Sequence, residues 1–118
     1  MPYLLLIHEP NGQRLTRTEA EGKAVFDRML RFGAGLKEKG QLLAMESLAA
    51  PGTAARVSVR GDAKPLVLDG PFAEAKEFVG GFFLVDVGTR EEALAIAAEC
   101  PAAGWATVEV RETGPCFA

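Results

Sequence analysis

One segment, residues 69–77, collects the side chains best suited to binding or chemistry. Gly70-Pro71 forces a sharp bend after a strand, which would let Phe72 drop into the core as a wedge. Asp69 is expected either to cap this bend as an Asx turn or to serve in a site. Gly80-Gly81, just behind the segment, would let the backbone approach a neighbouring group closely. The predicted pocket or motif residues are Asp69, Gly70, Pro71, Phe72, Glu74, Lys76 and Glu77.

Three charged residues of this segment, Glu74, Lys76 and Glu77, place mixed charge on a short turn. We expect the two glutamates to be solvated turn charges, with catalytic acids as the alternative, and Lys76 to pair with one of them.

The single histidine, His8, ends an apolar run and is the candidate base. His8 and Asp69 both stand at expected strand ends, so they could meet in space. A carboxylate beside an imidazole holds its tautomer and raises its basicity, which makes this pair the catalytic hypothesis. The alternative is a histidine bonded to a loop carbonyl or to water.

Other familiar chemistries have no signature in the chain. Cys100 and Cys116 lack CxxC spacing and a histidine tract, so we expect two free thiols. Phosphate loop, nucleophile elbow, zinc spacing and Rossmann glycines are absent from the sequence. We therefore expect neither a cofactor nor a metal.

Composition points to one globular domain over residues 1–118, with 48% hydrophobic and 25% charged residues. The net charge of -3, without a dense basic block, argues against nucleic acid and membrane surfaces as partners. The apolar run Tyr3-Leu4-Leu5-Leu6-Ile7 is too short for a signal peptide or a membrane span, so a buried strand and a cytoplasmic location are expected.

Two amphipathic helices and six strands should position these residues. The capping box Thr18-x-x-Glu21 starts the first helix, which Gly40 ends. The second helix starts with Thr89-x-x-Glu92 and stops near Cys100 because of Pro101. Gly61-Asp62 predicts a hairpin turn. The order β-α-β, an inserted hairpin, then β-α-β predicts an α+β, ferredoxin-like fold. The expected strands are Tyr3 to His8, Gln41 to Ala49, Ala55 to Arg60, Leu66 to Asp69, Phe82 to Val87 and Trp105 to Glu112.

Both faces of the expected sheet are apolar. Tyr3, Leu5 and Ile7 point one way, while Leu4 and Leu6 point the other. Two helices cover one face, so the other needs a partner's sheet, which predicts a homodimer. Charged residues that interrupt strands should be paired or lie at a rim, and Trp105 should anchor the core or an interface. The interrupting residues are Glu46, Asp86, Glu109 and Arg111, and the alternating pattern of residues 56–60 favours an exposed hairpin.

The segment from Asp69 to Glu77, followed by Gly80-Gly81-Phe82-Phe83, resembles the signature of the DGPF family in the YCII-related group of dimeric α+β barrel proteins. Similar residues occur at Tyr3 to Ile7, at Cys100-Pro101-Ala102-Ala103 and at Val108-Glu109-Val110-Arg111. The resemblance implies a ferredoxin-like homodimer with a pocket between sheet and loop. Some relatives accompany sigma factors of the extracytoplasmic type, which suggests a link to transcriptional regulation.

Relatives in the wider group are associated with a His and Asp pair, and one branch resembles a dehydrochlorinase of a chlorinated hydroquinone. Their histidine lies on the first helix, whereas residues 18–39 contain none here. Three functions stay open. The first is a dimeric module that binds a small organic molecule. The second is a cofactor-free lyase or proton-transfer enzyme using Asp69 with His8. The third is an interaction protein whose loop only seals the dimer.

Overall fold

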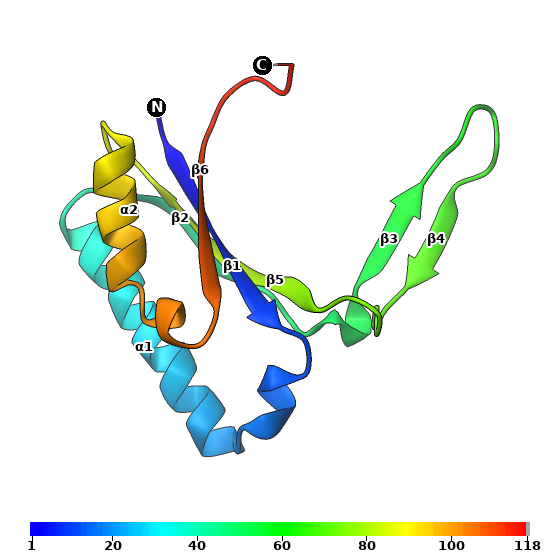
Figure 1. Ribbon diagram of the computed structural model, residues 1–118, viewed down its shortest axis with the longest axis horizontal. Coiled ribbons are helices and arrows are strands. Elements are labelled where there is room, and N and C mark those ends of the chain that lie inside the picture. Colours follow the sequence, from blue (N-terminus) through cyan, green and yellow to red (C-terminus); the bar gives the residue numbers. More distant parts are fainter. Residues whose placement is uncertain (118) are drawn as a thin grey trace.

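The computed structural model describes residues 1–117, which form a four-stranded sheet, two α-helices and a separate two-stranded hairpin (Figure 1). The elements follow one another as β1 (Tyr3–Pro10), η1 (Gln13–Thr16), α1 (Glu19–Glu38), β2 (Leu42–Ser47), η2 (Pro51–Thr53), β3 (Ala55–Ser58), β4 (Leu66–Asp69), β5 (Glu77–Val85), α2 (Arg90–Glu99), η3 (Pro101–Gly104) and β6 (Thr107–Glu112).

Both helices begin and end where the local signals predict. Thr18 caps α1 in a full capping box, with its hydroxyl accepting the Glu21 N–H at 3.1 Å and Glu21 accepting the Thr18 N–H at 2.8 Å. The pKa of the Glu21 carboxyl is lowered, first by the bond from the Thr18 N–H and then by the Thr18 hydroxyl. Gly40 ends α1 at φ 71°, a left-handed conformation that favours glycine. The Thr89 hydroxyl caps α2 by accepting the Glu92 N–H at 3.2 Å, and α2 ends before Pro101.

The main sheet is antiparallel with strand order β2-β5-β1-β6, and both helices pack against one of its faces. The alternation of β1 and β5 builds that face, because every second side chain points to the same side. The described residues thus form an α+β fold, as predicted. The core contains Tyr3, Leu5, Ile7, Phe83 and Val85 from the sheet, packed against Leu36, Ala93, Ile96 and Ala97 from the helices.

The opposite side of the sheet, here called the open face, carries apolar side chains that neither helix covers. Leu4 pairs with Leu84 and Leu6 pairs with Phe82, and all four are only half-buried. Charged residues from both edge strands flank this apolar centre, as the register shows. They are Glu46 on β2 and Glu109 and Arg111 on β6.

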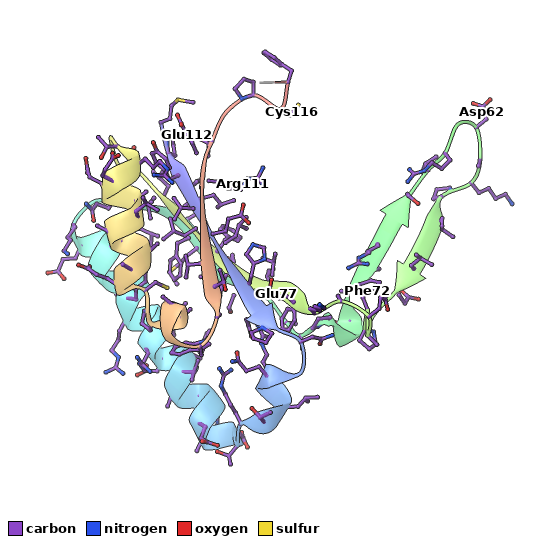
Figure 2. All side chains as sticks on the ribbon, in the orientation of Figure 1. Asp62, Phe72, Glu77, Arg111, Glu112 and Cys116 are labelled. Carbon is purple, nitrogen blue, oxygen red and sulfur yellow. The ribbon has the colours of Figure 1, made fainter. Side chains whose placement is uncertain are left out.

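Strands β3 and β4 form a hairpin, residues 55–69, that stands away from the body and is here called the arm (Figure 1). Its turn contains Gly61 at φ 57°, so the Gly61-Asp62 turn and the exposed hairpin are confirmed. In Figure 2, Asp62 lies at the tip of the arm and Phe72 at its root.

Some boundaries differ from the sequence prediction. β5 begins at Glu77 rather than Phe82: the two glycines lie inside the strand, where Gly81 pairs with Ile7 and Gly80 is skipped by the register. β6 begins at Thr107 rather than Trp105, since η3 extends to Gly104 and Trp105 is its C-cap. Within residues 1–117, neither helix combines the length and the apolar character that crossing a membrane would require.

Candidate functional site

The bend at Gly70-Pro71 fastens the root of the arm to η2. The Gly70 N–H donates to the Ala54 carbonyl at 2.7 Å, and the peptide bond before Pro71 is cis. A Cβ on Gly70 would overlap the Pro51 carbonyl oxygen, so only glycine fits here. The neighbouring Asp69 is exposed at the end of β4, and its carboxylate makes no hydrogen bond to residues 1–117. It therefore does not act as the Asx cap that we expected as one of its two roles.

Phe72 is not the core wedge that the sequence predicted. It is half-buried, lies outside the core cluster, and has the Arg56 guanidinium 3.7 Å from its ring centroid. The reason is its position at the root of the arm, away from the packed face of the sheet (Figure 2).

The rest of the segment is exposed and held by its backbone. Asn11 donates its N–H to the Lys76 carbonyl at 2.8 Å and its side-chain amide to the Ala75 carbonyl at 2.9 Å. Lys76 forms no ion pair with either Glu74 or Glu77 in residues 1–117, contrary to our expectation. The two glutamates are solvated, as expected.

The structure pairs His8 with Glu109 rather than with Asp69. His8 Nε2 lies 2.7 Å from Glu109 Oε1, and the side chains are 27% and 40% exposed. The β1–β6 register explains the contact: Leu6 pairs with Glu109, and His8 follows two residues later on the same face. No hydrogen bond connects His8 and Asp69 within residues 1–117.

A pocket of about 630 Å³, here called the loop pocket, lies where the root of the arm meets the end of the sheet. It joins the histidine to the predicted segment but does not include Asp69. Its lining includes His8, Arg56, Phe72, Glu77 and Phe78.

A second cavity of about 570 Å³, here called the helix–sheet cavity, lies between the first half of α1 and the helix-bearing face of the sheet. Its walls are mostly apolar and come from α1 on one side and β1, β2 and β5 on the other. They include Val25, Phe26, Met29 and Leu30 of α1 and Ile7, Met45 and Phe83 of the sheet.

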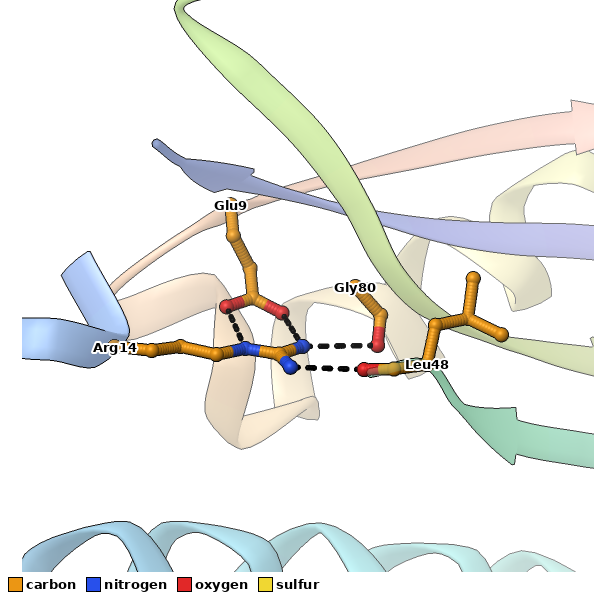
Figure 3. Close-up of polar contacts among 4 residues, drawn as sticks. All are labelled: Glu9, Arg14, Leu48 and Gly80. Carbon is orange, nitrogen blue, oxygen red and sulfur yellow. Dashed lines mark hydrogen bonds and ion pairs between the residues drawn. The ribbon is translucent and has the colours of Figure 1, made fainter. Parts of the chain in front are cut away.

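An ion pair between the buried Glu9 and the partly exposed Arg14 forms the polar part of this cavity (Figure 3). Arg14 donates from Nε to Glu9 Oε1 at 2.9 Å and from one terminal nitrogen to Glu9 Oε2 at 2.7 Å. The same guanidinium also donates to the carbonyls of Leu48 at 2.8 Å and Gly80 at 3.3 Å. It therefore ties η1, β1, β5 and the residue after β2 together at one point.

Two glycines make this arrangement possible. Gly12, at φ 86°, turns the chain from β1 into η1, so that Arg14 folds back onto Glu9. Gly80 lies between the β5 residues that pair with Ile7 and His8, and a Cβ there would overlap the Glu9 carboxylate. The close approach expected at Gly80 is thus made to a carboxylate.

Trp105 and Arg17 line the same cavity. The guanidinium groups of Arg17 and Arg28 lie 5.7 and 5.1 Å from the indole centroid. Gln13 donates to the Trp105 carbonyl at 2.8 Å. Trp105 packs against the core, as predicted, and also borders the cavity.

Sequence reasoning missed the ion pair, although one signal was present. Glu9 continues the alternation of Tyr3, Leu5 and Ile7, so its carboxylate had to point into the core face. A buried carboxylate needs a cation, and Arg14 is the next basic residue along the chain.

The two cysteines are free, as predicted: Cys100 is buried and Cys116 is exposed. Burial raises the pKa of the Cys100 thiol.

Comparison with known proteins places the chain in a family. The YCII-related domain family matches residues 1–115. An uncharacterised protein of Rhizobium meliloti (strain 1021) is 36% identical over 84 residues, which make up 68% of this chain and 67% of that protein. The family match covers nearly the whole chain, including both cavities and both helices, and the chain therefore belongs to the YCII-related family.

Proposed function

We propose that this protein binds a small, mostly apolar organic molecule in the helix–sheet cavity. The observation that carries the proposal is a cavity of about 570 Å³ whose apolar walls meet the partly buried Glu9–Arg14 pair. Pockets for small molecules typically combine apolar walls with a few fixed polar groups that set the orientation.

The ion pair favours a ligand without a net charge. Each Glu9 oxygen already accepts a hydrogen bond from Arg14, so the two charges balance within the pair. A charged ligand group would compete with this pair for its partner. A hydroxyl or carbonyl group on an apolar skeleton would instead add a hydrogen bond without breaking the pair.

The proposal includes a homodimer. The strand order and the two helices on one face support a ferredoxin-like fold of the DGPF branch, and the apolar open face supports a dimeric α+β barrel. In such a protein, ligand binding could be reported to a regulator, which is the link to transcription that the resemblance suggests.

A thermal-shift screen of small aromatics and metabolites tests the proposal. A ligand at 100 times its Kd should stabilise the protein by about 2.7 kcal/mol. Val25→Trp fills the cavity and should abolish the shift, whereas Ala24→Trp, on an exposed position beside it, should preserve it. Equal shifts in both variants would place the ligand elsewhere.

A second candidate function is proton transfer in the loop pocket, because the His8–Glu109 pair supplies a base and its orienting carboxylate. If Nε2–H donates to Glu109, Nδ1 is left free to accept a substrate proton, and Glu109 stabilises the resulting imidazolium. Asp69, which the sequence suggested as the partner of His8, does not line the loop pocket and has no role in this function. Turnover that persists in His8→Gln would reject this function. A thermal-shift screen in which no compound stabilises the protein would favour the third function, a purely structural interaction protein.

A further inference from the structure

The arm exposes apolar side chains on both of its faces. Val57 pairs with Val67 on one face, and they are 65% and 54% exposed. Leu66 and Leu68 project from the other face and are 56% and 52% exposed. A two-stranded hairpin alone is marginally stable in water, so an arm of this kind needs a surface to pack on.

The chain has far more surface than a compact protein of its size. A compact monomer of 12.5 kDa exposes about 6,200 Å², whereas this chain exposes 8019 Å². The radius of gyration is 16.2 Å, against about 13.5 Å for a compact domain of this length. The excess of about 1,800 Å² equals one chain's share of a large, permanent dimer interface.

The charges of the arm and of the open face favour a second copy of this chain as the partner that covers the excess surface. The arm carries three basic residues, Arg56, Arg60 and Lys64, against Asp62 and Asp69. The open face and its edge carry Glu46, Glu77 and Glu109 against Arg111. A basic arm and an acidic sheet on one chain are complementary across a two-fold axis, where each chain offers both surfaces.

The loop pocket lies at the junction of these two surfaces. Arg56 and Phe72 come from the root of the arm, while His8 and Val79 face the same side as the open face. A second copy that covers the open face would therefore also cover this pocket.

We infer that the arm clasps a second copy of this chain and that this copy closes the loop pocket, so that each pocket is shared between two chains. The inference rests on the proposed homodimer and adds the role of the arm and the shared site.

The test compares three charge insertions in the untagged protein by sedimentation velocity at several concentrations. Val57→Glu and Leu68→Glu place a carboxylate on opposite faces of the arm. Leu15→Glu is the matched control, because Leu15 is 91% exposed on η1, away from the arm and the open face. We expect at least one arm variant to weaken the dimer by roughly 100-fold or more, because a carboxylate buried at an interface lacks a partner.

Two outcomes separate this inference from the proposal beneath it. A wild-type protein that stays at 12.5 kDa at all concentrations would overturn both the dimer and the arm. If the wild type is a dimer and both arm variants dimerise as tightly as Leu15→Glu, the role of the arm is overturned while the homodimer stands. Circular dichroism spectra that match the wild type would show that the variants are folded.

Chemical modification of His8 tests separately whether the second copy covers the loop pocket. His8 is the only histidine, and its side chain is 27% exposed in the single chain. Diethyl pyrocarbonate should modify His8 at least about 10-fold more slowly in the wild-type dimer than in a dissociated arm variant. Equal rates in the dimer and in the dissociated variant would show that the second copy does not cover the pocket.

Discussion

Replacing Arg14 by Met should be among the most damaging single changes outside the core cluster. Among residues 1–117, the substitution removes the only cation bonded to Glu9, whose side chain is 8% exposed, and it also releases the carbonyls of Leu48 and Gly80. Breaking a buried pair from one side costs about 3–5 kcal/mol. Because the Arg14 side chain is 31% exposed, water can reach part of the gap, so we expect about 3 kcal/mol. For a chain of this length, that loss lowers Tm by about 12 °C.

Urea denaturation followed by circular dichroism at pH 7 measures the loss, at one fixed protein concentration because a dimer unfolds in a concentration-dependent way. The control is Lys23→Met, which breaks the exposed pair with Glu19 and should cost about 0.5 kcal/mol or less. Glu9→Leu combined with Arg14→Met should recover most of the stability. If Arg14→Met cost no more than Lys23→Met, the ion pair would not hold η1 to β1 and β5.

Three further changes probe other parts of the chain. Gly80→Ala places a Cβ against the buried carboxylate and should destabilise by about 2 kcal/mol in urea melts, whereas Gly114→Ala, which has open space around it, should be near neutral. Phe72→Ala should cost about 1 kcal/mol, because the ring is half-buried outside the core; a loss of 3 kcal/mol or more would restore the wedge interpretation. In the native protein a thiol reagent should modify Cys116 only. Burial raises the pKa of the Cys100 thiol above its ordinary value of 9.0, so the folded state favours the protonated thiol and this contribution to stability is complete below pH 9.0. The free energy of unfolding should therefore fall as the pH rises above 9.0, and it should fall less steeply with pH in Cys100→Ala.

The sequence predicted those parts of the fold that depend on local chemistry. Thr18 and Thr89 each start a helix because their hydroxyls bond to a backbone N–H three residues later, and neighbouring residues suffice to show this. The alternation in β1 likewise predicted both the core face and the open face.

The site was less predictable because it depends on contacts between distant residues. His8 and Glu109 meet across 101 positions, and that contact requires the register of β1 with β6. Phe72 looked like a core residue, but its place at the root of the arm depends on how the hairpin leaves the sheet. The short turn that brings Arg14 back to Glu9 contains no sequence motif from which the ion pair could be predicted.

The helix–sheet cavity can be tested directly through the methionine methyl groups. The chain has three methionines, of which Met29 and Met45 line the cavity while Met1 is exposed and outside it. We predict that a neutral aromatic probe such as 1-naphthol shifts the NMR signals of Met29 and Met45, leaves Met1 in place, and has no effect in Val25→Trp. If the Met29 and Met45 signals stayed unchanged, or shifted equally in Val25→Trp, the cavity would not be the binding site.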